Sequence, residues 1–219
     1  MHIWFIMDWN RRWAKSVWMP KFYWHKKWAD TLESLIEYLP KYWVKHATFY
    51  TLSTENMERE ESELKDLFKL LEKFTSKKDL FEKNQVKFNF IWKLDWFPES
   101  TKKSIYDLKE FTKGFEKLNM QIAINYWWRD EMVRCFEKLK NSWEEISEEN
   151  ISKNLDNPEY PDPELIIRTW WKKRISNFLL WQSAYSEFYF IDKMWPAFKE
   201  EDFKEALDFL NWAGKTFGK

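Results

Sequence analysis

Glycine and cysteine are both scarce in this chain. Its 219 residues include 3 glycines and 17 tryptophans, although globular proteins carry glycine at about 7% of their positions. Because tight turns often need backbone torsions that only glycine adopts without cost, so few glycines are unusual for a protein with many turns. The single cysteine, Cys135, excludes an internal disulfide and fits a reducing compartment.

The chain also lacks an excess of charge of either sign and has no long apolar runs. The chain has 36 basic and 36 acidic residues and a formal net charge of zero, which disfavours binding to nucleic acid. No apolar stretch approaches the roughly 20 residues of a membrane-spanning helix, and no signal peptide precedes the first predicted strand. We therefore expect a cytoplasmic protein, with one domain over residues 1–219.

Short apolar strands alternate with amphipathic helices along the chain. The predicted strands cover residues 3–7, 46–52, 86–92, 121–125, 165–168 and 187–191. The predicted helices cover residues 24–39, 60–83, 98–117, 129–140, 147–154, 175–184 and 200–212. This alternation is typical of an α/β fold with a central, mostly parallel six-stranded sheet flanked by helices.

The first predicted strand leads into a group of charged residues. Asp8 follows it directly, at the carboxyl end, where open α/β sheets bind their ligands. Several cationic and amide side chains come next, namely Asn10, Arg11, Arg12, Lys15, Lys21 and His25. One carboxylate among many cations suits Mg²⁺ with a phosphorylated ligand, because the metal prefers oxygen donors and arginine binds phosphate. The alternative is a structural aspartate paired with Arg12.

Two more polar clusters follow later strands. Residues 53–59 form a polar loop after the second predicted strand, and Arg168, Arg174 and Ser176 form a cationic pocket after the fifth. Parallel strands point their carboxyl ends to one edge of the sheet, so we expect the three clusters to meet there. Two anion pockets beside one metal-binding aspartate suggest two phosphorylated substrates. Ordinary surface ion pairing is the alternative for Arg168 and Arg174.

These motifs, taken in order, resemble those of the cis-prenyltransferases, and most closely the bacterial undecaprenyl diphosphate synthases. The resemblance runs through four segments in chain order: Asp8-x-Asn10-x-Arg12-Trp13-Ala14-Lys15 with His25; Ser53-x-Glu55-Asn56 with Arg59; Asn125-Tyr126 with Arg129-Asp130-Glu131; and Ile167-Arg168-Thr169, Arg174-Ile175-Ser176-Asn177, Glu187 and Trp195-Pro196. Matches in order from residue 2 to residue 196 cover nearly the whole chain.

The resemblance implies an activity and a set of partners. Family members add isopentenyl diphosphate units to an allylic diphosphate such as farnesyl diphosphate, with Mg²⁺, and make long polyprenyl diphosphates that carry cell-wall precursors. It also implies a homodimer, contact with the inner face of the membrane during product release, and an apolar tunnel for the product. Helices 25–39 and 60–83, with Phe88 and Phe90, are the candidates to line that tunnel; a simple core is their other interpretation.

The resemblance also assigns roles to individual residues. The implied catalytic residues are Asp8, Asn10, His25, Ser53 and Asn56. The implied substrate-binding residues are Trp9, Arg12, Trp13, Lys21, Met57, Arg59, Arg168, Arg174 and Ser176. Asp8 would bind Mg²⁺ together with Glu187, which would reach the metal across the dimer interface.

Tryptophan stands where this family has glycine, at Trp9, Trp18, Trp24, Trp28, Trp43, Trp92, Trp127, Trp128, Trp170 and Trp171. A glycine beside Asp8 would let backbone N–H groups approach a diphosphate, whereas an indole fills that space. Either the chain has been redesigned, or its written letters differ from the polypeptide. The alternative function is a non-catalytic scaffold or subunit of the same fold, with phosphate loops blocked by tryptophan. Irregular tryptophan spacing argues against a third interpretation, a sugar-binding module.

Overall fold

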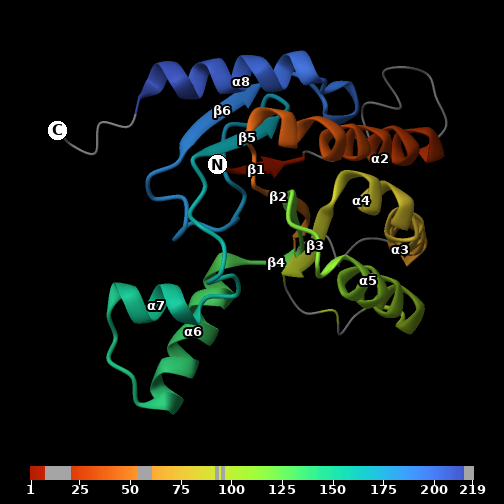
Figure 1. Ribbon diagram of the computed structural model, residues 1–219. Helices are drawn as coiled ribbons and strands as arrows, with labels where there is room; N and C mark the ends of the chain where they lie inside the picture. The colour runs from red at the N-terminus through yellow and green to blue at the C-terminus, as the bar shows by residue number, and fades with distance from the viewer. Residues whose placement is uncertain (8–20, 54–60, 92–93, 95–96, 215–219) are drawn as a thin grey trace.

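The computed structural model describes residues 1–7, 21–53, 61–91, 94 and 97–214, with the backbone alone for residues 21–25, 52 and 53. The described strands are β1 (His2–Ile6), β2 (His46–Ser53), β3 (Val86–Ile91), β4 (Leu118–Tyr126), β5 (Leu165–Thr169) and β6 (Glu187–Ile191). They form one six-stranded sheet in the order β3-β4-β2-β1-β5-β6 (Figure 1). Every neighbouring pair is parallel, which confirms the predicted fold class.

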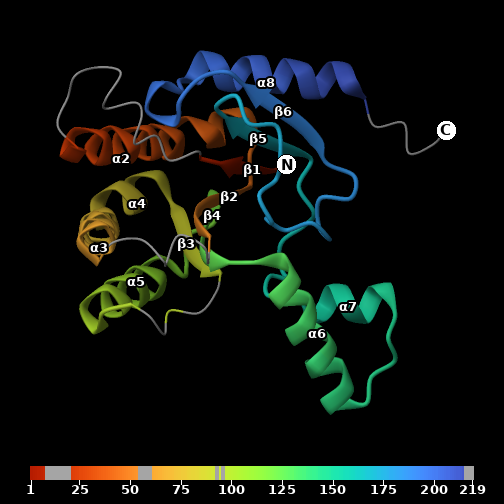
Figure 2. The same cartoon turned by 180° about the vertical axis from the view of Figure 1, so that it is seen from behind.

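Helices connect the strands. They are α2 (Lys21–Tyr38) with the 3₁₀ turn η1 (Leu39–Tyr42), α3 (Glu61–Thr75), α4 (Lys78–Asn84), α5 (Glu99–Thr112), α6 (Trp128–Ser142), α7 (Glu148–Asn154), the 3₁₀ turn η3 (Trp195–Ala197) and α8 (Glu200–Ala213). Figure 2 shows α6 and α7 as a pair that projects away from the other helices. In the described part of the chain, no helix has both the length and the apolar character to cross a bilayer.

The larger core lies on one face of the sheet. Alternate strand residues such as Phe5, Phe49 and Phe88 are fully buried there, because side chains of a strand point to its two faces in turn. They pack under apolar side chains of α2, α3, α4, α5 and α8. Phe5 and Phe49, on neighbouring strands, stack with 4.9 Å between their ring centroids. Burial of each such ring contributes about 2–3 kcal/mol to folding.

The other face is covered mainly by a loop, where a helix was expected over residues 175–184. That prediction is wrong. Ser176, Asn177 and Leu179 have φ values of 50°, 63° and 37°, and a right-handed helix contains no such residues. The apolar run is buried for another reason: Phe178 and Leu179 pack directly on sheet residues of this face, among them Trp4.

The predicted helix over residues 60–83 is also wrong as a single element, since α3 ends at Thr75 and α4 begins at Lys78. The hydroxyl groups of Thr75 and Ser76 donate hydrogen bonds to the carbonyl oxygens of Leu71 and Lys73. Hydroxyl groups that bond to backbone carbonyls in this way compete with helix continuation. The chain therefore turns here, and a periodic apolar pattern alone does not reveal the break.

A buried histidine lies at the amino end of the sheet, opposite the edge with the predicted clusters. His2 is 1% exposed, and its Nε2 lies 2.9 Å from the indole Nε1 of Trp4. Because an indole can only donate, His2 Nε2 must accept and Nδ1 carries the proton. Nδ1 then donates to the carbonyl oxygen of Pro161 at 2.6 Å. Burial lowers the pKa of His2 to about 3, against the opposing effect of the Pro161 bond.

The lowered pKa of His2 predicts a loss of stability in acid. Between its usual pKa of 6.5 and about 3, the unfolded chain binds one proton more than the folded chain. The free energy of unfolding should therefore fall by about 1.4 kcal/mol from this group for each pH unit of acidification in that window. Urea unfolding of the parent chain and of His2→Gln measures this slope. The substitution should flatten it, and identical slopes would contradict the assignment.

Candidate functional site

The site expected from the sequence lies at the carboxyl edge of the sheet, where β1, β2 and β5 end side by side. Ile6 pairs with Tyr50 of β2 on one side and with Arg168 of β5 on the other. Asp8 follows Ile6 by two residues, and Ser53 is the last residue of β2. The strand order therefore brings the starts of the three polar clusters to one edge.

The predicted site residues divide into three groups. Outside the described residues lie Asp8, Trp9, Asn10, Arg12, Trp13, Asn56, Met57 and Arg59. Described by their backbone alone are Lys21 and His25 in α2 and Ser53 in β2. Described with their side chains are Arg168, Arg174, Ser176 and Glu187.

Arg168 is the centre of the part of the site that the structure describes. It is 2% exposed, so its guanidinium is buried and surface ion pairing is the wrong interpretation for it. Its Nη1 donates to the hydroxyl of Ser176 at 2.8 Å and to the carbonyl oxygen of Arg174. Both acceptors are oxygen atoms of uncharged groups, and these two bonds fix the direction of Nη1. Arg168 and Ser176 therefore meet through their side chains, whereas Arg174 meets Arg168 through its backbone carbonyl group and has an exposed side chain.

The loop that carries Ser176 is fastened to the neighbouring β4–α6 connection. The backbone N–H of Trp128, the first residue of α6, donates to the carbonyl oxygen of Asn177 at 3.2 Å. Behind it, the buried carboxylate of Glu131 accepts from the hydroxyl of Tyr126 and from the backbone N–H of Asp156 at 2.8 Å. Burial raises the pKa of Glu131, while these hydrogen bonds oppose the shift. Glu131 thereby ties the first turn of α6 to the end of β4.

Among the residues that the structure describes, three tryptophans have a left-handed backbone. Trp170, two residues after Arg168, has φ 76°, and Trp43 and Trp143 have φ 62° and 58° directly after helical segments. Left-handed residues at helix ends are usually glycine, since a Cβ atom is unfavourable there. The indoles of Trp43 and Trp143 are 82% and 94% exposed, so little packing compensates. Trp28 differs, because it is helical and 5% exposed within the core.

Comparison with known proteins decides the family. The family model for undecaprenyl diphosphate synthases matches residues 6–218. The chain belongs to this family. It is 41% identical to an isoprenyl transferase of Fusobacterium nucleatum, with 99% of this chain and 95% of that protein covered. It is 39% identical to the (2E,6E)-farnesyl-diphosphate-specific ditrans,polycis-undecaprenyl-diphosphate synthase of Micrococcus luteus, over 99% of this chain and 90% of that protein.

Solved structures of cis-prenyltransferases share the fold. Lavandulyl diphosphate synthase from Lavandula x intermedia, solved with dimethylallyl diphosphate, superposes with a TM-score of 0.94 at 26% identity. A probable undecaprenyl diphosphate synthase from Campylobacter jejuni superposes with a TM-score of 0.85 at 30% identity. Both comparisons cover 100% of this chain and 98% of the other. The cis-prenyltransferase fold and the prenyl-elongating enzyme class are therefore shown for this chain.

Glu187 lies at the amino end of the sheet, opposite the edge where β1, β2 and β5 end. It begins β6, where it pairs with Leu165 at the amino end of the sheet, and Leu165 in turn pairs with Ile3 of β1. Within the described ranges, no three His, Cys, Asp or Glu side chains are grouped to bind a metal.

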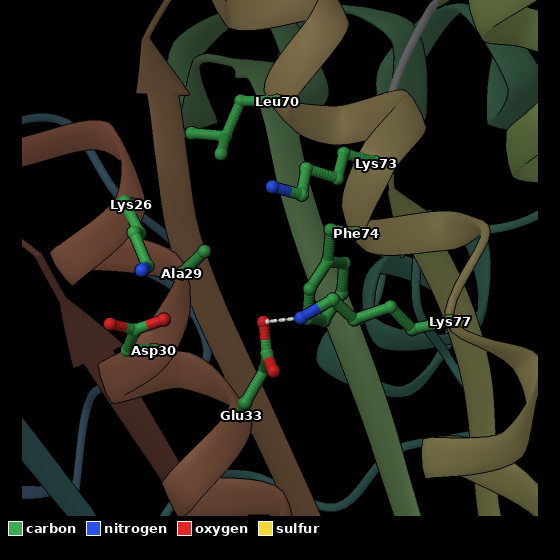
Figure 3. Close-up of a pocket in the computed structure, with 8 residues that line it drawn as sticks. All are labelled: Lys26, Ala29, Asp30, Glu33, Leu70, Lys73, Phe74 and Lys77. Carbon is green, nitrogen blue, oxygen red and sulfur yellow. Dashed lines mark hydrogen bonds and ion pairs between the residues drawn. The ribbon is translucent and has the colours of Figure 1, made fainter. Parts of the chain in front are cut away.

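A small cavity separates α2 from α3 (Figure 3). Its volume is about 80 Å³, and Ala29, Leu70 and Phe74 line it beside charged residues. The ammonium group of Lys77 lies 2.5 Å from the carboxylate of Glu33 across it. A long prenyl chain does not fit this volume, since 80 Å³ holds only a few water molecules. Phe88, expected to line a tunnel, is instead 1% exposed in the core, and Phe90 packs on Tyr106.

Proposed function

We propose that this cis-prenyltransferase condenses isopentenyl diphosphate onto an allylic diphosphate such as farnesyl diphosphate and makes a long, undecaprenyl-type polyprenyl diphosphate. The observation that carries the proposal is the buried guanidinium of Arg168, oriented by Ser176 and Arg174 at the carboxyl edge of the sheet. A diphosphate suits such a donor group because arginine binds phosphate oxygens with paired N–H bonds. The substrate named for the Micrococcus luteus relative favours farnesyl diphosphate as the primer.

The reaction needs two diphosphates held side by side. The bond between C1 of the allylic substrate and its diphosphate oxygen breaks, C4 of isopentenyl diphosphate bonds to C1, and C2 of the new unit loses a proton. Arg12, Lys21 and Arg59 would hold the allylic diphosphate, while Arg168, Arg174 and Ser176 would hold that of isopentenyl diphosphate. Asn10 and His25 would lie beside the reacting carbons, with Ser53 and Asn56 positioning the isopentenyl unit.

The carboxylates of Asp8 and of Glu187 from a second copy of the chain offer the hard oxygen donors that Mg²⁺ prefers. When bound, the metal would stabilise the negative charge that develops on the departing pyrophosphate. Because Glu187 would come from a second copy of the chain, a homodimer is part of the proposal. Because the product is a long apolar chain, we also propose that the cytoplasmic enzyme contacts the membrane transiently for release.

Incorporation of labelled isopentenyl diphosphate into a lipid-extractable product tests the proposal. We expect incorporation with farnesyl diphosphate and Mg²⁺, and its loss when EDTA removes the metal. The control is the same protein without the allylic primer. Absence of incorporation by folded chain, both as written and with glycine in place of Trp43, Trp143 and Trp170, would overturn the enzyme proposal. It would favour the non-catalytic scaffold, for which the left-handed backbone of Trp170, two residues after Arg168, is the supporting observation.

We further propose that the active polypeptide carries glycine at the left-handed positions where tryptophan is written. Trp43, Trp143 and Trp170 occupy backbone that favours glycine, and two of the three indoles are almost fully exposed. Tryptophan alone is written at these positions, although it is chemically unrelated to glycine. A codon that is written as tryptophan but that the source cell decodes as glycine explains this pattern best. Under this proposal, the loops at the sheet edge keep the close backbone approach that a diphosphate needs.

A further inference from the structure

Tyr50 links the rigid sheet to the loop that orients Arg168. It lies in the middle of β2, between β1 and β4, and is 6% exposed. Its ring stacks on Phe178 of the loop, with 4.4 Å between the centroids and 16° between the planes. Its hydroxyl lies 3.3 Å from the carbonyl oxygen of Ser176 and 3.4 Å from that of Tyr126, and it donates to these acceptors.

The loop needs such support because its backbone is unfavourable. Ser176, Asn177 and Leu179 all have positive φ, and non-glycine residues keep this conformation only when their surroundings hold them in it. Tyr50 contacts the loop at two points, through its ring and through its hydroxyl. The hydroxyl contacts the backbone of Ser176, and the side chain of Ser176 accepts a hydrogen bond from Arg168. Tyr50 and Arg168 therefore contact the same residue, Ser176, through its backbone and its side chain respectively.

We propose that Tyr50 is a positioning residue for the anion pocket of Arg168, Arg174 and Ser176, and that it acts through the carbonyl group of Ser176. This inference rests on the proposed function, in which the pocket holds the diphosphate of isopentenyl diphosphate. Tyr50 itself touches no substrate in this proposal. Its hydroxyl fixes Ser176 relative to β2, and Ser176 then fixes the donor direction of Arg168. Loss of the hydroxyl weakens binding of one substrate and leaves the other unchanged.

Tyr50→Phe is the direct test, because it removes the hydroxyl and keeps the ring that stacks on Phe178. We expect the KM for isopentenyl diphosphate to rise about fivefold, the free-energy equivalent of one neutral hydrogen bond. The KM for farnesyl diphosphate should change by less than about twofold. Tyr42→Phe is the matched control, since it removes a tyrosine hydroxyl that bonds to Glu200 at 2.6 Å outside the pocket. It should leave both constants unchanged, whereas equal effects of the two variants would overturn the inference.

A double substitution separates positioning from general destabilisation. If Tyr50 acts through Ser176, combining Tyr50→Phe with Ser176→Ala should weaken binding no more than Ser176→Ala alone, because interacting residues are not additive. If the two substitutions instead weaken binding by independent factors that multiply, the inference is overturned. The dissociation constant of isopentenyl diphosphate, measured by calorimetry without an allylic primer, requires no turnover. If the chain shows no incorporation but Tyr50→Phe binds isopentenyl diphosphate more weakly, the positioning role is supported although the proposed function fails. If the chain is active but Tyr50→Phe binds isopentenyl diphosphate as tightly as the parent, only the positioning role is overturned.

Discussion

Arg168→Met is expected to lower kcat/KM for isopentenyl diphosphate by about a thousandfold. Two or more charge-assisted hydrogen bonds to a diphosphate, each about 1.5–3 kcal/mol, account for a loss of this size. Methionine keeps the length of the side chain but offers neither charge nor donors, so Ser176 and the loop lose their link to β5. The loss of the guanidinium leaves the carbonyl oxygen of Arg174 without this donor, so circular dichroism must first show that the variant is folded. Steady-state kinetics with each substrate varied in turn measures the effect.

Arg134→Met is the matched control for this experiment. Arg134 is also well ordered by hydrogen bonds, with Nη1 at 2.6 Å from Asp156 and Nε at 2.8 Å from Asp130, but it lies on α6 rather than at the sheet edge. Its replacement should lower the melting temperature and leave kcat/KM within about twofold of the parent. A loss of less than tenfold in folded Arg168→Met would contradict the role assigned to Arg168.

The sheet could be predicted from the sequence because strands of a parallel sheet are short, apolar and separated by helices. The position of Arg168 at the carboxyl end of β5 followed from the same pattern. The course of the chain after it did not, since an apolar run such as residues 178–181 is equally compatible with a buried helix and with a loop pressed against the sheet. Only the left-handed torsions of Ser176 and Asn177 distinguish the two, and they have no clear sequence signal.

Tyr50 illustrates the same limit for the site. Its hydroxyl meets a carbonyl group 126 residues away in the chain. Any residue can offer a backbone carbonyl, so no residue type or spacing marks this contact in the sequence. The position of Tyr50 on a strand next to a motif predicts that its side chain is buried. It does not predict which group the hydroxyl contacts. By contrast, side-chain pairs such as Arg168 and Ser176 could be proposed together because both residues belong to one motif.

Trp170→Gly is expected to raise kcat/KM for isopentenyl diphosphate by about tenfold. Trp170 has φ 76° two residues beyond Arg168, and its backbone N–H donates to the carbonyl oxygen of Lys193 at 2.7 Å. Glycine adopts this backbone without the cost of about 1–2 kcal/mol that a Cβ atom brings, and it removes an indole that comes two residues after Arg168 in the chain. The measurement is steady-state kinetics in the incorporation assay. Unchanged kinetics would show that the indole is no obstacle to the substrate.

Two other tryptophans separate the effect on the site from the effect on the backbone. Trp143→Gly changes an exposed, left-handed residue after α6 and should raise the free energy of unfolding by about 1 kcal/mol without altering the kinetics. Trp212→Gly changes an 85% exposed residue within α8 and should lower it by about 0.5 kcal/mol, since helical backbone disfavours glycine. Equal effects of the two variants would contradict a preference for glycine at the left-handed positions.

The intact mass of the protein from its natural source tests whether these positions are decoded as glycine. A mass that equals that of the written sequence would exclude decoding as glycine. The tryptophans would then be tolerated, at the cost in stability that these variants measure.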